Sequence, residues 1–491
     1  MSRPRMSVTL WVSLLLAIVG PEMAGCTTNP ATGESSFTGL MSESDEVRIG
    51  REAHAEVLAQ FGGAYKDPEL DRYVDSLGQL LARASDRPNL QYHFTVLDSP
   101  IVNAFATPGG YVYITRGLLA LANSEAEVAG VLAHEIGHVA ARHAAERQSQ
   151  AVLASLPGIF TGVVTGSDTL AQAVNSGAAA HLQSYSRDQE YQADLLGVRY
   201  LTRTNYDPLG MASFLRQLQS NDKLEATIMD RPEMADQYSI MSTHPRTADR
   251  IQRAIQEAGG TPVANPIIER DIFLSKIDGL RYGDEPEQGF IRDRQFLHPI
   301  LRFGFEVPAG FHMMNTADAV VAQRADGAAI LLSSTQKFTS SSMLGYLTDE
   351  WAPRLQMTDA ETIDVNGMDA ATGSGQLELK SGMRDVRLVA IRFDADTIFR
   401  FIFLTKAEQT GALARELQET TYSFRRLSPA EAARLHPQEI RVVAVRAGDS
   451  VAKLAAKMPF PDLREERFRV LNGLTPGDRL TPGEHVKIIV E

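Results

Sequence analysis

The sequence predicts an α+β multidomain protein, and three observations lead to this fold class. The chain has 491 residues, 44% of them hydrophobic, which is enough to bury several separate cores. Its first half contains long apolar stretches with helical spacing, and the texture changes after Gly259-Gly260-Thr261-Pro262. Beyond that point apolar and polar residues alternate, as from Leu301 to Val307, which is typical of strands.

The N-terminus has the layout of a secretory signal that ends in a lipobox. Two arginines precede an apolar run from Val8 to Val19, and Met23-Ala24-Gly25-Cys26 follows it. The run is shorter than the roughly 20 residues that span a bilayer. Cys26 is the only cysteine, so it forms no internal disulfide, and lipid attachment explains its position. We expect residues 1–25 to be a signal peptide and the protein to be lipid-anchored at Cys26. Thr27 resembles the residue found in lipoproteins sent to the outer membrane, which places the protein in the periplasm.

The expected first domain, residues 26–262, contains the segment His134-Glu135-Ile136-Gly137-His138 in an apolar helical run. Residues four apart lie on one helix face, so both histidines can bind one Zn²⁺ while Glu135 lies beside the metal. Two ordinary helix histidines are the alternative. The metzincin pattern fails because positions 141 and 144 are alanines. His143 comes about 140° around a continued helix from His138, so we expect it to face away and to serve packing or hydrogen bonding.

The third metal ligand is expected on a second amphipathic helix that begins near Tyr185. Glu190 and Asp194 are four residues apart and share one face. Glu190 completes a site with two histidines and one glutamate, which holds one zinc ion per chain and leaves the fourth position to water. Asp194 is placed to accept the other ring N–H of a ligand histidine.

With these motifs the chain resembles metallopeptidase family forty-eight, the gluzincin group of the HtpX, BepA, Oma and CAAX-prenyl proteases. The resemblance covers about half the chain, from Asn29-Pro30-Ala31-Thr32-Gly33 to Arg250. It implies a mainly helical domain with a small β-sheet, zinc bound by His134, His138 and Glu190, and Glu135 as general base. It also implies an edge strand that holds extended substrates by backbone pairing, formed by Asn103, Ala104, Phe105 and Ala106.

Two residues of the segment Thr243 to Arg250 are candidates to stabilise the oxyanion of the reaction, His244 and Arg250. The residues do not decide between them. In some periplasmic relatives the histidine that matches His244 occupies the open metal position and keeps the enzyme inactive. A His-Pro turn that begins a helix is the alternative interpretation of His244.

The remaining segments carry no catalytic pattern. Residues 151–180, rich in Gly, Ala, Ser and Val, are expected to form a hairpin over the cleft or a packed helical pair. Residues 266–428 are expected to form an α+β accessory domain for substrate or partner binding, in which His298 and His312 are structural. Residues 438–491 resemble a LysM module, a small βααβ fold whose family binds the N-acetylglucosamine of peptidoglycan. A docking role for proteins is the alternative there.

The leading functional hypothesis is a periplasmic zinc endopeptidase, anchored to the outer membrane, that removes unfolded or misassembled envelope proteins. One alternative is a non-proteolytic chaperone or assembly factor for outer-membrane proteins with a latent metal site. Another is a peptidoglycan hydrolase, which the LysM-like tail suggests. A net charge of −13 without a basic run argues against nucleic acid as a partner.

Overall fold

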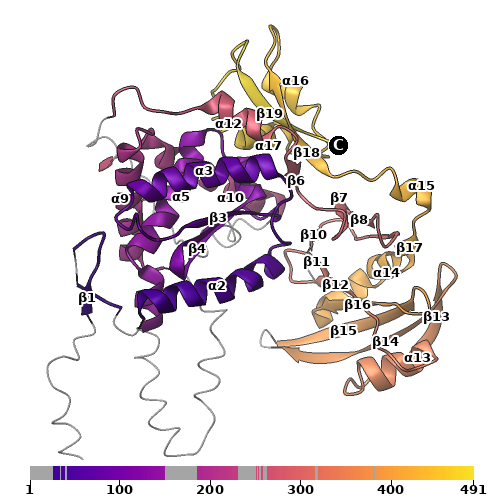
Figure 1. Ribbon diagram of the computed structural model, residues 1–491. Helices are drawn as coiled ribbons and strands as arrows, with labels where there is room; N and C mark the ends of the chain where they lie inside the picture. The colour runs from indigo at the N-terminus through magenta and orange to yellow at the C-terminus, as the bar shows by residue number, and fades with distance from the viewer. Residues whose placement is uncertain are drawn as a thin grey trace, which may run out of the picture. The chain divides into compact units, whose positions relative to one another are not determined.

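The computed structural model of the chain describes residues 26–33, 35–38, 41–149, 185–230, 250, 253, 256–257, 263–315, 319–379 and 382–491. They form two compact units (Figure 1). Residues up to Lys276, apart from 219–230, make the first unit, and residues 219–230 with those from Ile277 onward make the second. The expected signal peptide, the expected hairpin at 151–180 and His244 lie outside the described residues. None of the helices in the described ranges has the length and apolar character that crossing a membrane requires.

The first unit is mainly helical, as expected. Its helices are α2 (Glu43–Gln60), α3 (Pro68–Ala84), α4 (Arg116–Leu121), α5 (Glu125–Ala140), α9 (Arg187–Arg203), the part of α10 (Leu209–Ile228) up to Leu218, and α12 (Arg270–Ile277) up to Lys276. Local sequence sets where these helices begin. The hydroxyl of Ser124 caps α5 by accepting from Glu127 N, and Ser186 forms a capping box with Gln189 at the start of α9. The two helices that carry the expected metal ligands therefore have defined starts.

A small sheet lies beside these helices, with the strand order β3-β5-β4. β3 (His93–Leu97) runs parallel to β5 (Tyr111–Thr115), and β4 (Ala104–Thr107) pairs antiparallel with β5. The short turn between β4 and β5 requires glycine at Gly109, which has φ +79° and whose Cβ would lie 2.7 Å from the carbonyl oxygen of Glu46. The domain thus contains the small β-sheet that the resemblance implied, with β4 at one edge. A separate two-stranded hairpin is formed by β1 (Cys26–Thr28) and β2 (Ser35–Phe37).

Helices α5 and α9 pack closely because glycines lie at their crossing. A Cβ at Gly137 of α5 would come 3.0 Å from the carbonyl oxygen of Ala193 on α9. Every residue of α5 from Ala126 to Ala140 is buried, as expected for a helix that is apolar on all sides. This close crossing brings the face of α5 that carries His134 against α9.

The boundary expected at residue 266 differs from the structure. Ile267 exchanges backbone hydrogen bonds with Asn205 and Asp207 in the first unit, and the carbonyl of Glu269 accepts from Glu125 N at the start of α5. The segment before Lys276 therefore belongs to the first unit, where it covers the start of α5 and the loop before α10. Local spacing does not reveal such long-range backbone pairing.

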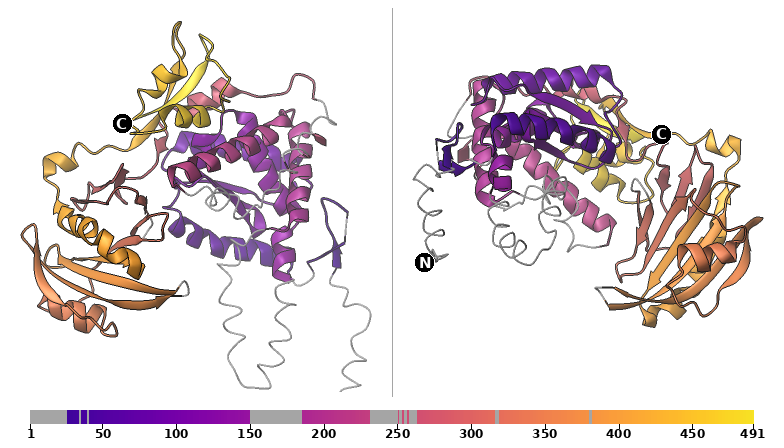
Figure 2. Two further views of the ribbon diagram at one scale, coloured as in Figure 1. Left: turned by 180° about the vertical axis from the view of Figure 1, so that it is seen from behind. Right: turned by 60° about the horizontal axis from the view of Figure 1, so that its bottom comes forward.

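The second unit contains a seven-stranded antiparallel sheet in the order β10-β11-β12-β16-β15-β14-β13. Its strands are β10 (His312–Asn315), β11 (Val320–Gln323), β12 (Ala329–Thr335), β13 (Glu361–Val365), β14 (Met368–Leu379), β15 (Gly382–Arg392) and β16 (Ile398–Thr405). Helix α14 (Ala407–Ser423) covers one face, and α13 (Met343–Gly345) with the π-helical turn η4 (Tyr346–Trp351) covers the other (Figure 1). Each face has its own apolar core. Figure 2 shows the same sheet from behind and from below.

A smaller antiparallel sheet, β17-β9-β8-β7, adds phenylalanines to the core on the α14 side. Its strands are β7 (Phe290–Arg292), β8 (Gln295–His298), β9 (Phe303–Glu306) and β17 (Arg425–Arg426), and the short helix α15 (Pro429–Ala432) follows. His298 is buried beside Phe296 and Phe303, and its Nδ1 accepts from Leu301 N at 3.2 Å. The α+β character expected for this region is confirmed.

The last segment contains β18 (Gln438–Ala444), α16 (Val451–Ala455), α17 (Arg464–Leu471) and β19 (His485–Val490). The two strands pair antiparallel, and β6 (Arg281–Tyr282) extends the sheet beside β18. The order βααβ is the one that a LysM-like module has. The extra strand β6 comes from a segment before the seven-stranded sheet, so this small sheet is built from two distant parts of the chain.

Candidate metal centre

The crossing of α5 and α9 brings His134, His138 and Glu190 together. The two Nε2 atoms lie 3.1 Å apart, His138 Nε2 lies 3.4 Å from Glu190 Oε1, and His134 Nε2 lies 3.6 Å from Glu190 Oε2. All three residues are buried. Within the part of the chain that the structure describes, they are the one group of three or more His, Cys, Asp or Glu with the geometry to hold a metal ion.

The distances between these atoms fit a tetrahedral zinc site. Zinc binds histidine nitrogen and carboxylate oxygen at about 2.0–2.2 Å, so two ligand atoms of a tetrahedral site lie about 3.3–3.5 Å apart. The three separations of 3.1, 3.4 and 3.6 Å lie within about 0.2 Å of this spacing. Two imidazoles and one carboxylate are also a donor set that zinc accepts in catalytic sites, where the fourth position stays open.

Arg250 holds two neighbouring carboxylates, those of Asp194 and of the proposed ligand Glu190. Asp194 Oδ1 lies 2.9 Å from His134 Nδ1, the nitrogen that points away from the ligand cluster. The guanidinium of Arg250 donates to both oxygens of Asp194, at 2.8 and 2.7 Å, and its Nη1 lies 2.7 Å from Glu190 Oε2. Three nitrogens of Arg250 therefore contact carboxylates behind the ligands.

The charges of this group stabilise one another. Burial alone would raise the pKa of Asp194, but the charge and hydrogen bonds of Arg250, together with His134, hold that pKa below its ordinary value. Burial would likewise lower the pKa of Arg250, but Asp194 and Glu190 raise it above its ordinary value. Asp194 is therefore an ionised acceptor for the ring N–H of His134 at neutral pH.

His138 has a different partner. Its Nδ1 lies 2.8 Å from Nδ1 of His143, and Nε2 of His143 lies 3.0 Å from Oε1 of Gln192 on α9. The ring of His138 also stacks on Tyr185, with the ring centroids 3.8 Å apart. Burial lowers the pKa of His143 to about 4, although its bond to Gln192 opposes this, so its ring is neutral at neutral pH.

The expectation that His143 faces away from the metal ligands is wrong, because α5 does not continue to this residue. The helix ends at Ala140, and Arg142 adopts a left-handed conformation with φ 60°. Its guanidinium is tied to the carboxylate of Glu46 at 2.6 Å and to the carbonyl of Met41 at 2.7 Å. The turn brings His143 back to His138, where it forms a hydrogen bond, one of the two roles expected for it.

The other predicted residues lie as follows. Glu135 is fully buried on α5, between the two ligand histidines in sequence. Ala104, Phe105 and Ala106 form most of β4, an edge strand whose residues are all buried, and the backbone of Asn103 pairs with Thr115 just before it. Tyr185, Gln192 and Arg142 were not singled out as site residues. Only their polar or aromatic character could have pointed to them, because their contacts come from distant segments.

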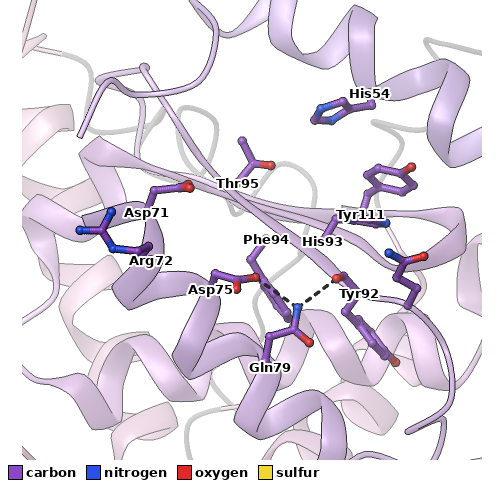
Figure 3. A pocket seen from close by; sticks show the side chains of 11 residues that line it. His54, Asp71, Arg72, Asp75, Gln79, Tyr92, His93, Phe94, Thr95 and Tyr111 are labelled. Atoms are coloured by element: carbon purple, nitrogen blue, oxygen red, sulfur yellow. Dashed lines mark hydrogen bonds between the residues drawn. The ribbon is translucent and has the colours of Figure 1, made fainter. Parts of the chain in front are cut away.

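A hollow of about 410 Å³ lies on the first unit, between α2, α3 and the edge of β3 (Figure 3). His93 stacks on Tyr111, and His54 lies over the same tyrosine ring. On the other wall Gln79 donates to Asp75 and to the carbonyl of Tyr92, as the dashed lines show. The histidines and carboxylates that line this hollow do not converge as metal ligands do. We therefore place the candidate metal site at the crossing of α5 and α9.

Comparison with known proteins decides the family. Residues 68–258, which include both ligand helices, match peptidase family M48. The chain carries an M48 domain. The family resemblance predicted from the motifs is therefore confirmed for this segment. The solved structures that resemble the chain include a cyanobacterial PsbP from Synechocystis, at 12% identity over 29% of this chain and 98% of that one, but its TM-score is only 0.22.

Three proteases are similar to the chain over part of its length. The chain is 30% identical to the putative beta-barrel assembly-enhancing protease of Vibrio cholerae over 47% of this chain and 48% of that protein. It is 30% identical to the beta-barrel assembly-enhancing protease of Escherichia coli over 55% of each chain. It is 28% identical to the mitochondrial metalloendopeptidase OMA1 of Schizosaccharomyces pombe, over 42% of this chain and 59% of that protein. The chain thus spans about half the length of the relatives it matches.

Proposed function

We propose that this chain is a zinc-dependent endopeptidase that removes unfolded or misassembled proteins of the bacterial envelope. The observation that carries the proposal is the convergence of His134, His138 and Glu190 at zinc-ligand spacing, with Glu135 buried on the same helix. The three side chains would hold one zinc ion per chain. The likeness to beta-barrel assembly-enhancing proteases and to a mitochondrial metalloendopeptidase supports a role in protein quality control at a membrane.

In the proposed reaction Glu135 is the general base. Zinc held by these residues would supply an activated water and would polarise the substrate carbonyl. Glu135 takes the proton from the attacking water and returns it to the leaving amine. Asp194 holds the ring of His134 by its Nδ1–H, while Arg250 keeps Asp194 ionised and also contacts Glu190. Because its donors are engaged there, we assign Arg250 to this supporting role, and His244 remains the candidate for the oxyanion.

Substrate binding is proposed at β4. This strand lies at the edge of the sheet, and the described residues place no strand on its outer side. An extended peptide can pair there by backbone hydrogen bonds, which demand little of its sequence. Such selection by accessibility suits a protease for unfolded chains, because folded proteins offer few extended segments.

We further propose that a lipid on Cys26 anchors the protein to the inner face of the outer membrane. The lipobox and the single cysteine support this location. The C-terminal βααβ segment supports a LysM-like module that contacts peptidoglycan, which lies within the same compartment. Both features would keep the peptidase close to newly exported envelope proteins.

The proposal is tested by cleavage of unfolded casein with quantified zinc, with and without a chelator. Wild-type protein should bind one zinc and cleave casein, and the chelator should stop cleavage. Replacing the base by Glu135→Gln should lower the rate by about 100-fold or more and leave zinc bound. Glu52→Gln, an exposed residue of α2, is the control that should change nothing. Protein that binds no zinc would refute the ligand assignment, and zinc without cleavage would favour the chaperone alternative or latency through His244.

A further inference from the structure

Both ligand histidines have a hydrogen-bonding partner on the ring nitrogen that faces away from the cluster. For His134 this partner is Asp194, and for His138 it is His143, which in turn contacts Gln192. We propose that His143 and Gln192 are positioning residues that fix the ring orientation and the tautomer of His138 for metal binding. This inference rests on the metal site of the proposed function.

The direction of the hydrogen bonds follows from the chemistry of the groups. The carbonyl oxygen of Gln192 can only accept, so Nε2 of His143 carries a hydrogen and donates to it. A neutral imidazole carries one ring hydrogen, which leaves Nδ1 of His143 as an acceptor. His138 must therefore donate from its own Nδ1 across the 2.8 Å contact. Its Nε2 then carries a lone pair, which points toward His134 and Glu190.

The reverse arrangement is incompatible with the ligand cluster. If the amide of Gln192 were turned round, it would donate to Nε2 of His143, and His143 would donate from Nδ1 to His138. His138 would then carry its hydrogen on Nε2, the atom that lies 3.4 Å from Glu190 Oε1 and 3.1 Å from His134 Nε2. A nitrogen with a hydrogen cannot bind a metal, so only the orientation in which the Gln192 oxygen accepts from His143 prepares the site.

The fold holds His143 in place at some cost. A non-glycine residue in the left-handed conformation, such as Arg142, is uncommon and persists only where other contacts determine it. Here Arg142 is held by Glu46, Met41 and Thr38, which lie about a hundred residues earlier in the chain. The buried carboxylate of Glu46 also pairs with Arg87 at 3.0 Å. This anchored turn is what directs the ring of His143 at His138.

A single helix supplies the partners of both histidines. Asp194 of α9 contacts His134 directly, and Gln192 of α9 contacts His143, which in turn contacts His138. Glu190 of the same helix is itself a proposed ligand. Tyr185, just before α9, stacks on the ring of His138 and limits its rotation. The position of α9 thus sets the orientation of both rings at once.

The experiment compares His143→Leu, His143→Asn and the control His54→Leu in the purified full-length chain. His54 is a partly buried histidine of α2 whose Nδ1 contacts the hydroxyl of Tyr113, away from the metal ligands. Zinc affinity is measured by competition with a chelator. The tautomer of His138 is read in the metal-free protein from the ¹⁵N shifts of its ring nitrogens, and thermal unfolding shows whether each variant is folded.

We expect His143→Leu to weaken zinc binding by about 10- to 100-fold and to change the ¹⁵N pattern of His138 from the Nδ1–H form to a mixture. In the His143→Asn variant the side-chain oxygen can accept the hydrogen bond from His138 that Nδ1 of His143 accepts in the wild type. This variant should therefore recover most of the zinc affinity. His54→Leu should bind zinc like the wild type. If folded His143→Leu keeps wild-type affinity and the wild-type ¹⁵N pattern, the inference is wrong. If wild-type protein binds no zinc, the proposed function fails instead.

Discussion

At the scale of single residues, the site depends on one buried arginine. Arg250 is the cation that faces the buried carboxylates Glu190 and Asp194, and each contact is 2.8 Å or shorter. Its removal would leave two carboxylates with reduced compensation in a region of low dielectric. The arginine therefore contributes to the stability of the site and to the ionised state of Asp194.

We predict that Arg250→Met lowers the free energy of unfolding of the metal-free protein by about 3–5 kcal/mol, because it breaks a buried ion pair by removing one partner. The measurement is urea unfolding followed by circular dichroism, read at the transition that added zinc shifts. Arg48→Met is the matched control, since Arg48 pairs with two carboxylates at the surface and should contribute about 0.5 kcal/mol or less. Equal losses for the two variants would contradict the prediction.

Residue types and spacing predicted much of the site. His134, Glu135 and His138 share a short segment, and Glu190 and Asp194 share a helix turn, so helical geometry is enough to group each set. The partners of Arg250 and the return of His143 could not be predicted in this way. The partners of Arg250 lie on α9, more than fifty residues away in the sequence. The return of His143 depends on where α5 ends, and Glu46 and Met41 hold the turn that follows it.

At the scale of elements, the crossing of α5 and α9 decides whether the ligands meet. Glycines at the crossing allow the helix backbones to approach, and Gly137 lies one residue from the ligand His138. A side chain at this position would separate the helices and move Glu190 away from the two histidines. Helical periodicity shows that both helices are amphipathic or buried, but it does not show which glycine lies at the contact.

We predict that Gly137→Ala destabilises the first unit by about 1–3 kcal/mol, because its Cβ would press on the backbone of Ala193. Alanine stabilises a helix by about 1 kcal/mol relative to glycine. The same substitution should therefore stabilise the protein at a helix position where the added methyl group has free space. Gly411→Ala in α14 is that control, since nothing lies within 4 Å of its added Cβ. Thermal unfolding measures both, and zinc affinity should fall for Gly137→Ala alone. A stabilised Gly137→Ala would show that the crossing is not tight.

At the scale of the whole molecule, the metal should stabilise one unit. A ligand that binds only the folded state adds about 4 kcal/mol at a thousandfold excess over its dissociation constant. All three proposed ligands lie in the first unit, whereas the second unit has its own cores on the two faces of its sheet. Zinc removal should therefore act on the first unit.

We predict that a chelator lowers the unfolding temperature of the first unit and leaves that of the second unchanged. Trp351 packs in the second unit, and the one other tryptophan, Trp11, lies in the expected signal peptide. The fluorescence of Trp351 in the protein without residues 1–25 thus follows the second unit, while calorimetry follows both transitions. If zinc shifted the unfolding temperature of the Trp351 transition as much as that of the first unit, the expectation would be wrong.

The sequence by itself determined the chemistry: which residues are able to bind zinc, which carboxylate is able to act as a base, and that an α+β region follows a helical one. These features depend on residue type and on spacing within a single element, where backbone geometry is regular. Only the tertiary structure decided that Arg250 holds Asp194, that His143 turns back to His138, and that residues 266–276 belong to the first unit. Such contacts join residues that are far apart in the chain, or depend on where a helix ends, and packing rather than local periodicity selects them.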